Sequence, residues 1–183
     1  MSSLQKISLK KLFTLQGSEF ESYHNVLKHL QPHPFLQPTP IVDFTFGEVA
    51  KIKMLLQNTT FENVIELFKT IFKIDEGLIY NMDVVQFYET FNWINNEVKQ
   101  IIEREVENLS SEPDSKLKDA GVDSLNIFKE LNTLILLGEK FATPPQEVEN
   151  WNYSLVFGLM LHNKITNDIN RRLVELNKTK AND

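Results

Sequence analysis

The chain contains no cysteine among its 183 residues. This absence excludes disulfides, thiolate metal ligands and cysteine nucleophiles, and it is compatible with a reducing compartment. Glycine is also scarce, and the six glycines stand singly along the chain. Because no glycine-rich loop is present to place backbone amides around a phosphate, the P-loop and the dinucleotide-binding fingerprint are both absent.

Other signals of chemistry or of membrane insertion are missing as well. No apolar run reaches the length of a signal peptide or of a membrane span. The four histidines do not fall at metal-ligand spacing, and the acidic residues of 103–114 lack the alternating pattern of a calcium loop. We therefore expect no metal, no cofactor, no catalytic residue and no membrane partner.

The formal net charge is −6, and the acidic residues are concentrated in the middle of the chain, residues 56–150. Such a surface repels phosphate backbones, which argues against nucleic acid as the main partner. A composition of 42% hydrophobic and 24% charged residues is typical of a globular protein.

Helix-start signals recur along the sequence. A Ser or Thr stands three residues before Glu or Gln at Ser18, Thr45, Thr59 and Thr143, the spacing of a capping box. Hairpin signals and strict alternation are absent. The patterns predict an all-α fold, a compact multi-helix bundle of about six to seven helices, with helices near 18–30, 45–57, 60–73, 83–108, 123–137, 144–150 and 153–177.

Prolines suggest the domain organisation. Four of the seven prolines lie in residues 31–40, which cannot form a helix and are expected to be extended. We predict an N-terminal arm with a helix and this Pro-rich connector over residues 1–43, and a helical body over 44–183 with a loop break near 109–115. The connector is interpreted as a stiff linker, with a Pro-rich ligand for a groove as the alternative.

Two long helices carry apolar stripes. In 83–108 the stripe has coiled-coil spacing, which indicates burial within the chain or pairing with another helix, so self-association through 84–101 is left open. In 153–177 the stripe includes His162, which is interpreted as a hydrogen-bonded core residue. A small enzyme that uses His162 with an acidic neighbour is a further alternative. Large aromatics anchor interfaces, and the residues chosen as candidate partner contacts are Phe35, Phe46, Trp93, Trp151 and Tyr153.

Residues 97–131 resemble an acyl or peptidyl carrier protein, because a helix and a loop lead to the motif Gly-Val-Asp-Ser-Leu at 121–125. The resemblance implies a phosphopantetheine arm on Ser124, and a serine at a helix N-terminus would suit a phosphodiester. The charge of the following residues sums to zero, whereas carriers have an acidic helix there. We expect Asp123 to act as an ordinary helix cap, and keep a carrier modified on Ser124 as the alternative function.

A second resemblance covers more of the chain. The segments FTFGEV at 44–49, the aromatic helix at 84–102 and EVENWNYSL at 147–155 resemble small α-helical assembly and structural proteins of tailed bacteriophages, including tail assembly chaperones. This resemblance implies a non-enzymatic protein that binds another protein of the phage tail or virion. It would be located in the cytoplasm of a bacterial host or in the particle itself.

Overall fold

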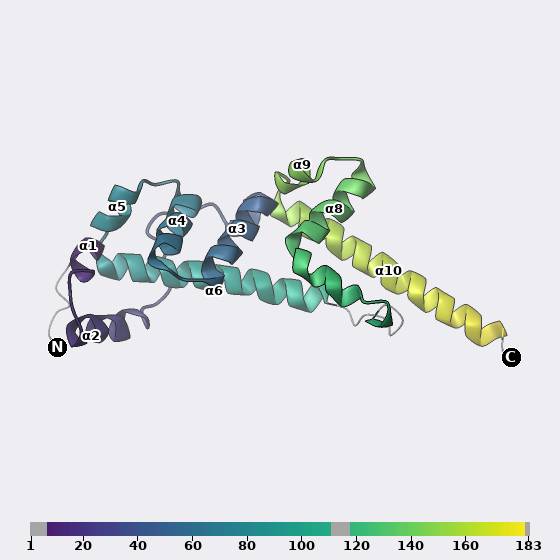
Figure 1. Ribbon diagram of the computed structural model, residues 1–183, viewed down its shortest axis with the longest axis horizontal. Helices are drawn as coiled ribbons and strands as arrows, with labels where there is room; N and C mark the ends of the chain where they lie inside the picture. Colours follow the sequence, from purple (N-terminus) through teal and green to yellow (C-terminus); the bar gives the residue numbers. More distant parts are fainter. Residues whose placement is uncertain (1–6, 111–117, 182–183) are drawn as a thin grey trace. The chain divides into compact units, whose positions relative to one another are not determined.

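The computed structural model describes residues 7–110 and 118–181 (Figure 1). Within these ranges the regular elements are helices, and two isolated β-bridges join Ser8 to Asp83 and Thr45 to Asn152. The all-α prediction is confirmed.

The chain forms two compact units. Unit 1 comprises Met1–Ile41 and Glu48–Ile101, and unit 2 comprises Val42–Gly47 and Ile102–Asp183. This division differs from the predicted boundary at residues 43 and 44, because the N-terminal segment groups with residues 48–101 instead of forming a separate arm. The predicted break near 109–115 begins where a helix ends, at Leu109, but its residues 111–115 lie outside the described part of the chain.

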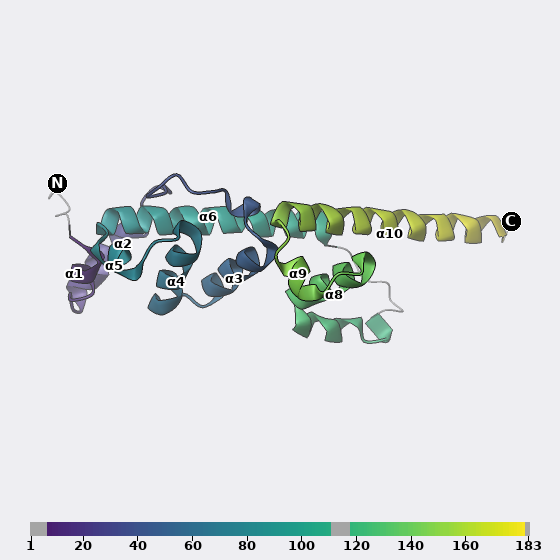
Figure 2. The same cartoon turned by 90° about the horizontal axis from the view of Figure 1, so that it is seen from above.

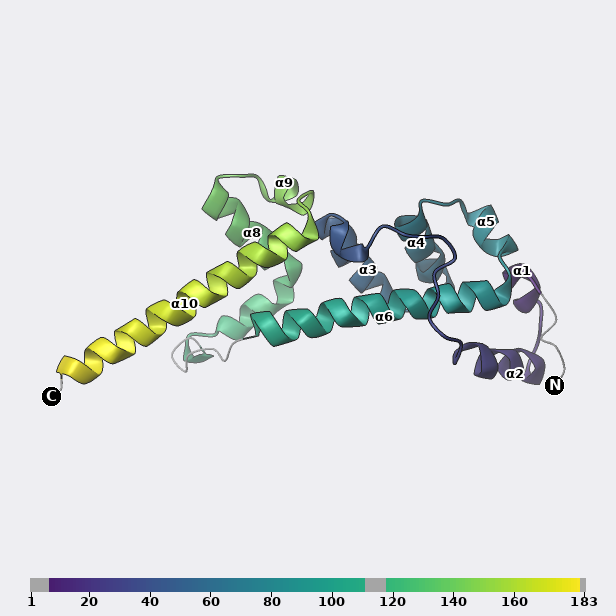
Figure 3. The same ribbon diagram turned by 180° about the vertical axis from the view of Figure 1, so that it is seen from behind.

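Unit 1 is built around the long helix α6, and Figures 1 and 3 show α4 and α5 on one side of α6 and α2 on the other. α3 begins in unit 2 and continues into unit 1, and α6 begins in unit 1 and ends in unit 2. The helices that contribute to unit 1 are α1 (Leu9–Leu12), α2 (Ser18–Leu27), α3 (Phe46–Gln57), α4 (Phe61–Phe72), α5 (Glu76–Asn81) and α6 (Val84–Leu109).

The core of unit 1 contains the apolar stripe of α6 that has coiled-coil spacing. Val84, Phe87, Ile94, Val98 and Ile101 are buried, and Thr90 between them is also buried. The Phe87 ring stacks on Phe68 of α4, with 4.8 Å between the ring centroids. The stripe is therefore buried within the chain, the first of the two uses that its spacing allowed.

The Pro-rich connector is non-helical, as predicted, and is fixed to α6 by hydrogen bonds. The His33 amide donates to the Glu89 carbonyl oxygen at 3.0 Å, and Thr90 Oγ1 donates to the His33 carbonyl oxygen at 3.4 Å. The Phe35 ring lies 6.2 Å from the Phe72 ring. Residues 31–40 are thus part of unit 1, because their backbone groups bond to its central helix.

The predicted helix starts have mixed outcomes. Thr60 caps α4 through a hydrogen bond from the Asn63 amide to its hydroxyl oxygen, so this start lies one residue after the predicted Thr59. Caps at Ser18 and Thr143 are wrong: the N-cap of α2 is Gly17, and the N-cap of α9 is Pro144. α5 was not predicted, because Gly77 weakens the helical pattern of this six-residue element.

Unit 2 contains the end of α6 and the C-terminal elements. They are the 3₁₀-helix η2 (Val122–Phe128) and the helices α8 (Glu130–Phe141), α9 (Pro145–Glu149) and α10 (Tyr153–Ala181). The segment that includes the 3₁₀-helix η1 (Ile41–Asp43) is bonded to the start of α10. The Tyr153 amide donates to the Phe44 carbonyl oxygen at 2.9 Å, and Ser154 Oγ donates to the Val42 carbonyl oxygen at 2.8 Å.

Replacing Ala142 by glycine is expected to stabilise unit 2 by about 0.5–1 kcal/mol. Ala142 is the C-cap of α8 and has a left-handed backbone conformation, at φ 52° and ψ 41°. A residue with a Cβ atom is strained in this conformation, whereas glycine adopts it freely. The control is Ala50→Gly inside α3, where the same substitution costs conformational entropy and is expected to destabilise. Urea unfolding of both variants checks this; equal signs for the two would contradict the backbone argument.

Candidate interaction surface

Exposed apolar side chains are unevenly divided between the two units. Of the 20 large hydrophobic residues that are exposed in the described part of the chain, 15 belong to unit 2. Scattered exposed apolar residues are normal on a protein surface, whereas exposed apolar residues that gather in a contiguous patch are candidates for an interaction site. In unit 2 these residues are Ile102, Val106, Leu125, Ile127, Phe128, Leu131, Ile135, Leu136, Phe141, Leu155, Ile165, Ile169, Leu173, Val174 and Leu176.

Five of these residues form what we call the η2–α8 surface: Leu125, Ile127, Phe128, Leu131 and Ile135. Asn132 Nδ2 donates to the Leu125 carbonyl oxygen at 2.7 Å and joins η2 to the first turn of α8. Leu131 and Ile135 are four residues apart and therefore share a face of α8. Ile127 is 76% exposed, the largest exposed fraction of any large hydrophobic residue in the described ranges.

A second group lies on α10, the longest described helix. Tyr153, Val156 and Phe157 in its first turns are buried in unit 2. Figures 1 and 2 show α8 and α9 beside this first part of α10, whereas its C-terminal part extends beyond them. The apolar stripe predicted along this helix, including Ile165, Ile169 and Leu173, is consequently exposed.

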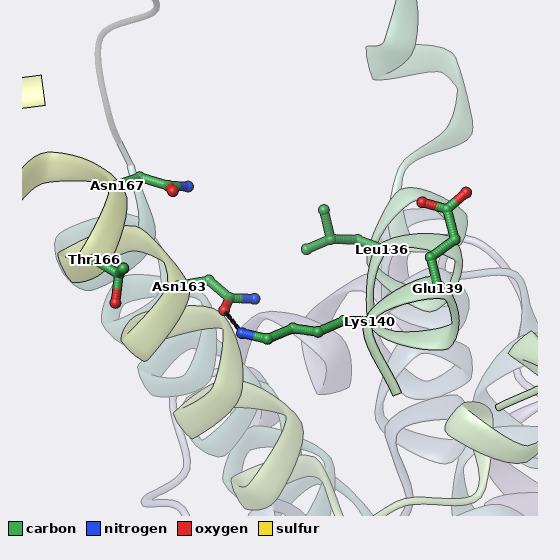
Figure 4. A pocket seen from close by; sticks show the side chains of 6 residues that line it. All are labelled: Leu136, Glu139, Lys140, Asn163, Thr166 and Asn167. Atoms are coloured by element: carbon green, nitrogen blue, oxygen red, sulfur yellow. Dashed lines mark hydrogen bonds between the residues drawn. The ribbon is translucent and has the colours of Figure 1, made fainter. Parts of the chain in front are cut away.

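An open groove of about 470 Å³ separates α8 from α10 (Figure 4). Lys140 Nζ donates to Asn163 Oδ1 across it. Among the described residues that line it, Glu139 is the only carboxylate and none is a histidine, so they provide no paired acid and base. The lining residues are Leu136, Glu139, Lys140, Asn163, Thr166 and Asn167.

The start of α10 is anchored to the end of α6 by a buried polar contact. Tyr153 Oη donates to Glu105 Oε1 at 2.9 Å, and the Arg104 guanidinium lies 4.1 Å from the centroid of the Phe157 ring. Burial of Tyr153, together with the charge of Glu105, raises the pKa of the tyrosine well above its usual value. The contact holds a neutral tyrosine in the core of unit 2 and supports the base of α10.

The five aromatic residues predicted to contact a partner have different surroundings. Phe46 and Tyr153 are buried, with 5% and 1% of their surface exposed. This burial removes them from the contact set, because the core of unit 2 already covers their side chains. Phe35, Trp93 and Trp151 are half-buried. The ring centroids of Trp93 and Phe72 are 6.3 Å apart. Trp151 packs edge-on against Phe141, with 5.6 Å between the ring centroids.

Ser124 does not stand at the start of an α-helix. It lies within η2, and α8 begins only at Glu130. Its hydroxyl group donates to the Gly121 carbonyl oxygen at 2.8 Å. The side chain is exposed, but the α-helix whose N-terminal dipole would suit a phosphodiester begins only at Glu130, and the 7-residue η2 has a smaller summed dipole.

His162 is exposed, which corrects its interpretation as a core residue. The correction agrees with its neighbours on the stripe, because Leu155 and Ile169 are 54% and 51% exposed. Among the residues that the structure describes, no group of three or more His, Asp or Glu is arranged to hold a metal ion. Within the same ranges, no helix combines the length and hydropathy needed to cross a bilayer.

The η2–α8 surface was missed by the sequence analysis. Its signal is present in residues 131–137, LNTLILL, where apolar residues fall on more than one side of a helix. Such a pattern indicates either complete burial or an uncovered apolar side. The structure shows the second case for Leu131 and Ile135.

Comparisons with known proteins identified no related protein. No protein-family model matches the chain, and no curated protein or solved structure is significantly similar to it.

Proposed function

We propose that this protein is a non-enzymatic interaction component that binds another protein chain through the exposed apolar residues of unit 2. The observation that carries the proposal is their concentration: unit 2 holds 15 of the 20 exposed large hydrophobic residues of the described chain.

Energetics support this proposal. Burying one large aliphatic or aromatic side chain contributes about 1.5–3 kcal/mol, so covering a few residues of the η2–α8 surface is enough for a specific complex. Charged residues adjoin this surface along α8, because Glu130 precedes Leu131 and Glu139 follows Ile135 by one helical turn. An apolar centre with a charged rim is the usual anatomy of a protein interface.

The resemblance to assembly proteins of tailed bacteriophages provides the proposed setting. In that setting the partner is a tail or virion protein, and the complex forms in the bacterial cytoplasm or persists in the particle. The carrier alternative keeps one supporting observation, the exposed hydroxyl group of Ser124. The 3₁₀ conformation around this serine favours the interaction proposal instead.

Charged substitutions on the η2–α8 surface are expected to reduce partner binding at least tenfold. The test is the double variant Ile127→Glu, Leu131→Glu, tagged and produced in the protein's own source, with bound partner quantified per tagged chain. The matched control is Met54→Glu, Leu78→Glu in unit 1, where the replaced residues are 59% and 56% exposed. Both variants change the net charge equally. If they retain or lose the partner to the same extent, the η2–α8 surface is not the binding site and the proposal fails for this surface.

A further inference from the structure

The exposed stripe of α10 has the spacing of a coiled coil. Steps of four and three residues alternate without a break over three heptads, a pattern that keeps the stripe facing one partner helix along its whole length. Leu155, His162, Ile169 and Leu176 take one core position of the heptad, and Leu159, Thr166 and Leu173 take the other. We call these seven residues the α10 seam.

The seam is exposed except at Leu159, which is half-buried. Ile169, Leu173 and Leu176 are 51%, 52% and 59% exposed. Where the seam passes α8, Thr166 faces the open groove and not a packed interface (Figure 4). A helix of this length with an apolar face is stable in water chiefly when that face is packed. We propose that the α10 seam pairs with the α10 seam of a second copy of this chain, as a parallel two-stranded coiled coil in register.

Charge placement favours an identical helix as the partner. Beside the seam, one flank carries the uncharged Asn163 and Asn170, and the other carries Ile165 and Arg172. No like charges therefore face each other when two copies are aligned in parallel. A helix of strongly acidic or basic character would find no complementary row on these flanks.

Three other charged side chains described on the helix lie away from the seam and pair with one another. Asp168 Oδ2 accepts from Lys164 Nζ at 3.4 Å, and Asp168 Oδ1 accepts from Arg171 at 3.1 Å. These three residues occupy the outer positions of the heptad, where solvent faces a two-stranded coiled coil. The same arrangement leaves the seam itself uncharged.

The polar residues of the seam and its exposure together favour the parallel orientation. In a parallel pair in register, His162 meets His162 and Thr166 meets Thr166, so polar layers face polar layers. An antiparallel pair keeps the polar layers together where His162 faces Thr166, and that register places Ile169 of one copy beside the half-buried Leu159 of the other, in the part of α10 that α8 and α9 flank (Figures 1 and 2). Polar core residues in coiled coils fix register and orientation because mismatched layers leave polar groups without partners.

This inference rests on the proposed function, because it names the partner of one exposed apolar group, the α10 seam. That partner is a second copy of the chain, and the η2–α8 surface is not part of this pairing. The test is sedimentation equilibrium of the full chain over a concentration series. Wild type is expected to form dimers, and Leu173→Asp is expected to weaken dimerisation at least tenfold. The matched control is Val174→Asp, because Val174 is 53% exposed on the same helix but lies off the seam. His162→Leu, which replaces the polar layer by an apolar one, is expected to strengthen dimerisation.

Orientation is tested by introducing single cysteines, which are the only thiols because the natural chain has none. Ile169→Cys is expected to form a disulfide with its own copy under mild oxidation, since facing core positions lie within disulfide reach. Lys164→Cys, on the outer face, is the control and should remain uncrosslinked. Crosslinking between Ile169→Cys and Leu159→Cys chains, but not between two Ile169→Cys chains, overturns the parallel arrangement.

Two outcomes overturn the pairing itself: a wild-type chain that stays monomeric at all concentrations, or equal effects of Leu173→Asp and Val174→Asp. The proposed function is judged independently, by the Ile127→Glu, Leu131→Glu variant. If that variant loses its partner while wild type is monomeric, only the pairing of α10 fails. If dimers form but the variant keeps its partner, the inference about α10 stands and the η2–α8 surface is not the binding site.

Discussion

Replacing Phe68 by alanine is expected to lower the free energy of unfolding of unit 1 by about 3–5 kcal/mol. The Phe68 side chain is completely buried in α4, and its ring stacks on Phe87 at 4.8 Å between centroids. Phe72 lies 5.7 Å from the same ring. Removing the ring loses its transfer free energy and leaves a cavity between α4 and α6 that the packed helices cannot fill.

The two tryptophans allow this loss to be measured in unit 1 alone. Trp93 lies in unit 1 and Trp151 in unit 2, so a Trp151→Phe background reports unit 1 through Trp93 fluorescence. The urea midpoint of Phe68→Ala in this background is expected to fall strongly. Met54→Ala, at a residue 59% exposed in the same unit, should change stability by less than about 0.5 kcal/mol. A loss below about 1 kcal/mol for Phe68→Ala would show that Phe68 does not occupy a tightly packed core.

Replacing Tyr153 by phenylalanine is expected to destabilise unit 2 by about 1.5–3 kcal/mol at neutral pH. The substitution keeps the ring and removes only the hydroxyl group that donates to Glu105 at 2.9 Å. A hydrogen bond to a charged acceptor is stronger than one to a neutral acceptor. Without the hydroxyl group, Glu105 stays partly desolvated but loses this hydrogen bond, which costs free energy. Trp151 fluorescence in a Trp93→Phe background follows unit 2.

The same contact makes the stability of unit 2 depend on pH in alkaline solution. Burial and Glu105 raise the pKa of Tyr153 in the folded chain above the ordinary value of 10.0. The folded chain therefore keeps its proton when the unfolded chain has lost it. This contribution is complete below about pH 10 and is lost as the pH rises toward the folded pKa, by at most about 1.4 kcal/mol per pH unit. Between pH 10 and higher pH, the free energy of unfolding of Tyr153→Phe should fall less than that of its parent. An identical fall in both chains would contradict the role of the Tyr153 hydroxyl proton.

Local patterns in the sequence were sufficient for most helices of unit 1. The spacing of Phe87, Ile94 and Val98 predicts the buried side of α6, since three- and four-residue steps place side chains on one face. The prolines of 31–40 predict a non-helical segment. The attachment of that segment to α6 was not predictable, because it depends on backbone groups such as the Glu89 carbonyl oxygen, which carry no side-chain signal.

The candidate surface was less predictable, because a sequence pattern shows which residues share a face but not what covers that face. The stripes of α6 and α10 have similar spacing, yet Ile94 is buried and Ile169 is exposed. Aromatic character was a poor guide for the same reason. Tyr153 and Phe46 are large and were natural candidates for an interface, but the core of unit 2 uses them instead.

The most direct test of the account is a native mass spectrum of the protein purified from its own source with its partners retained. The account predicts an unmodified chain in a complex of defined stoichiometry, held by the apolar residues of unit 2. A chain that is found alone, with the added mass of a phosphopantetheine arm on Ser124, would contradict the account and identify a carrier.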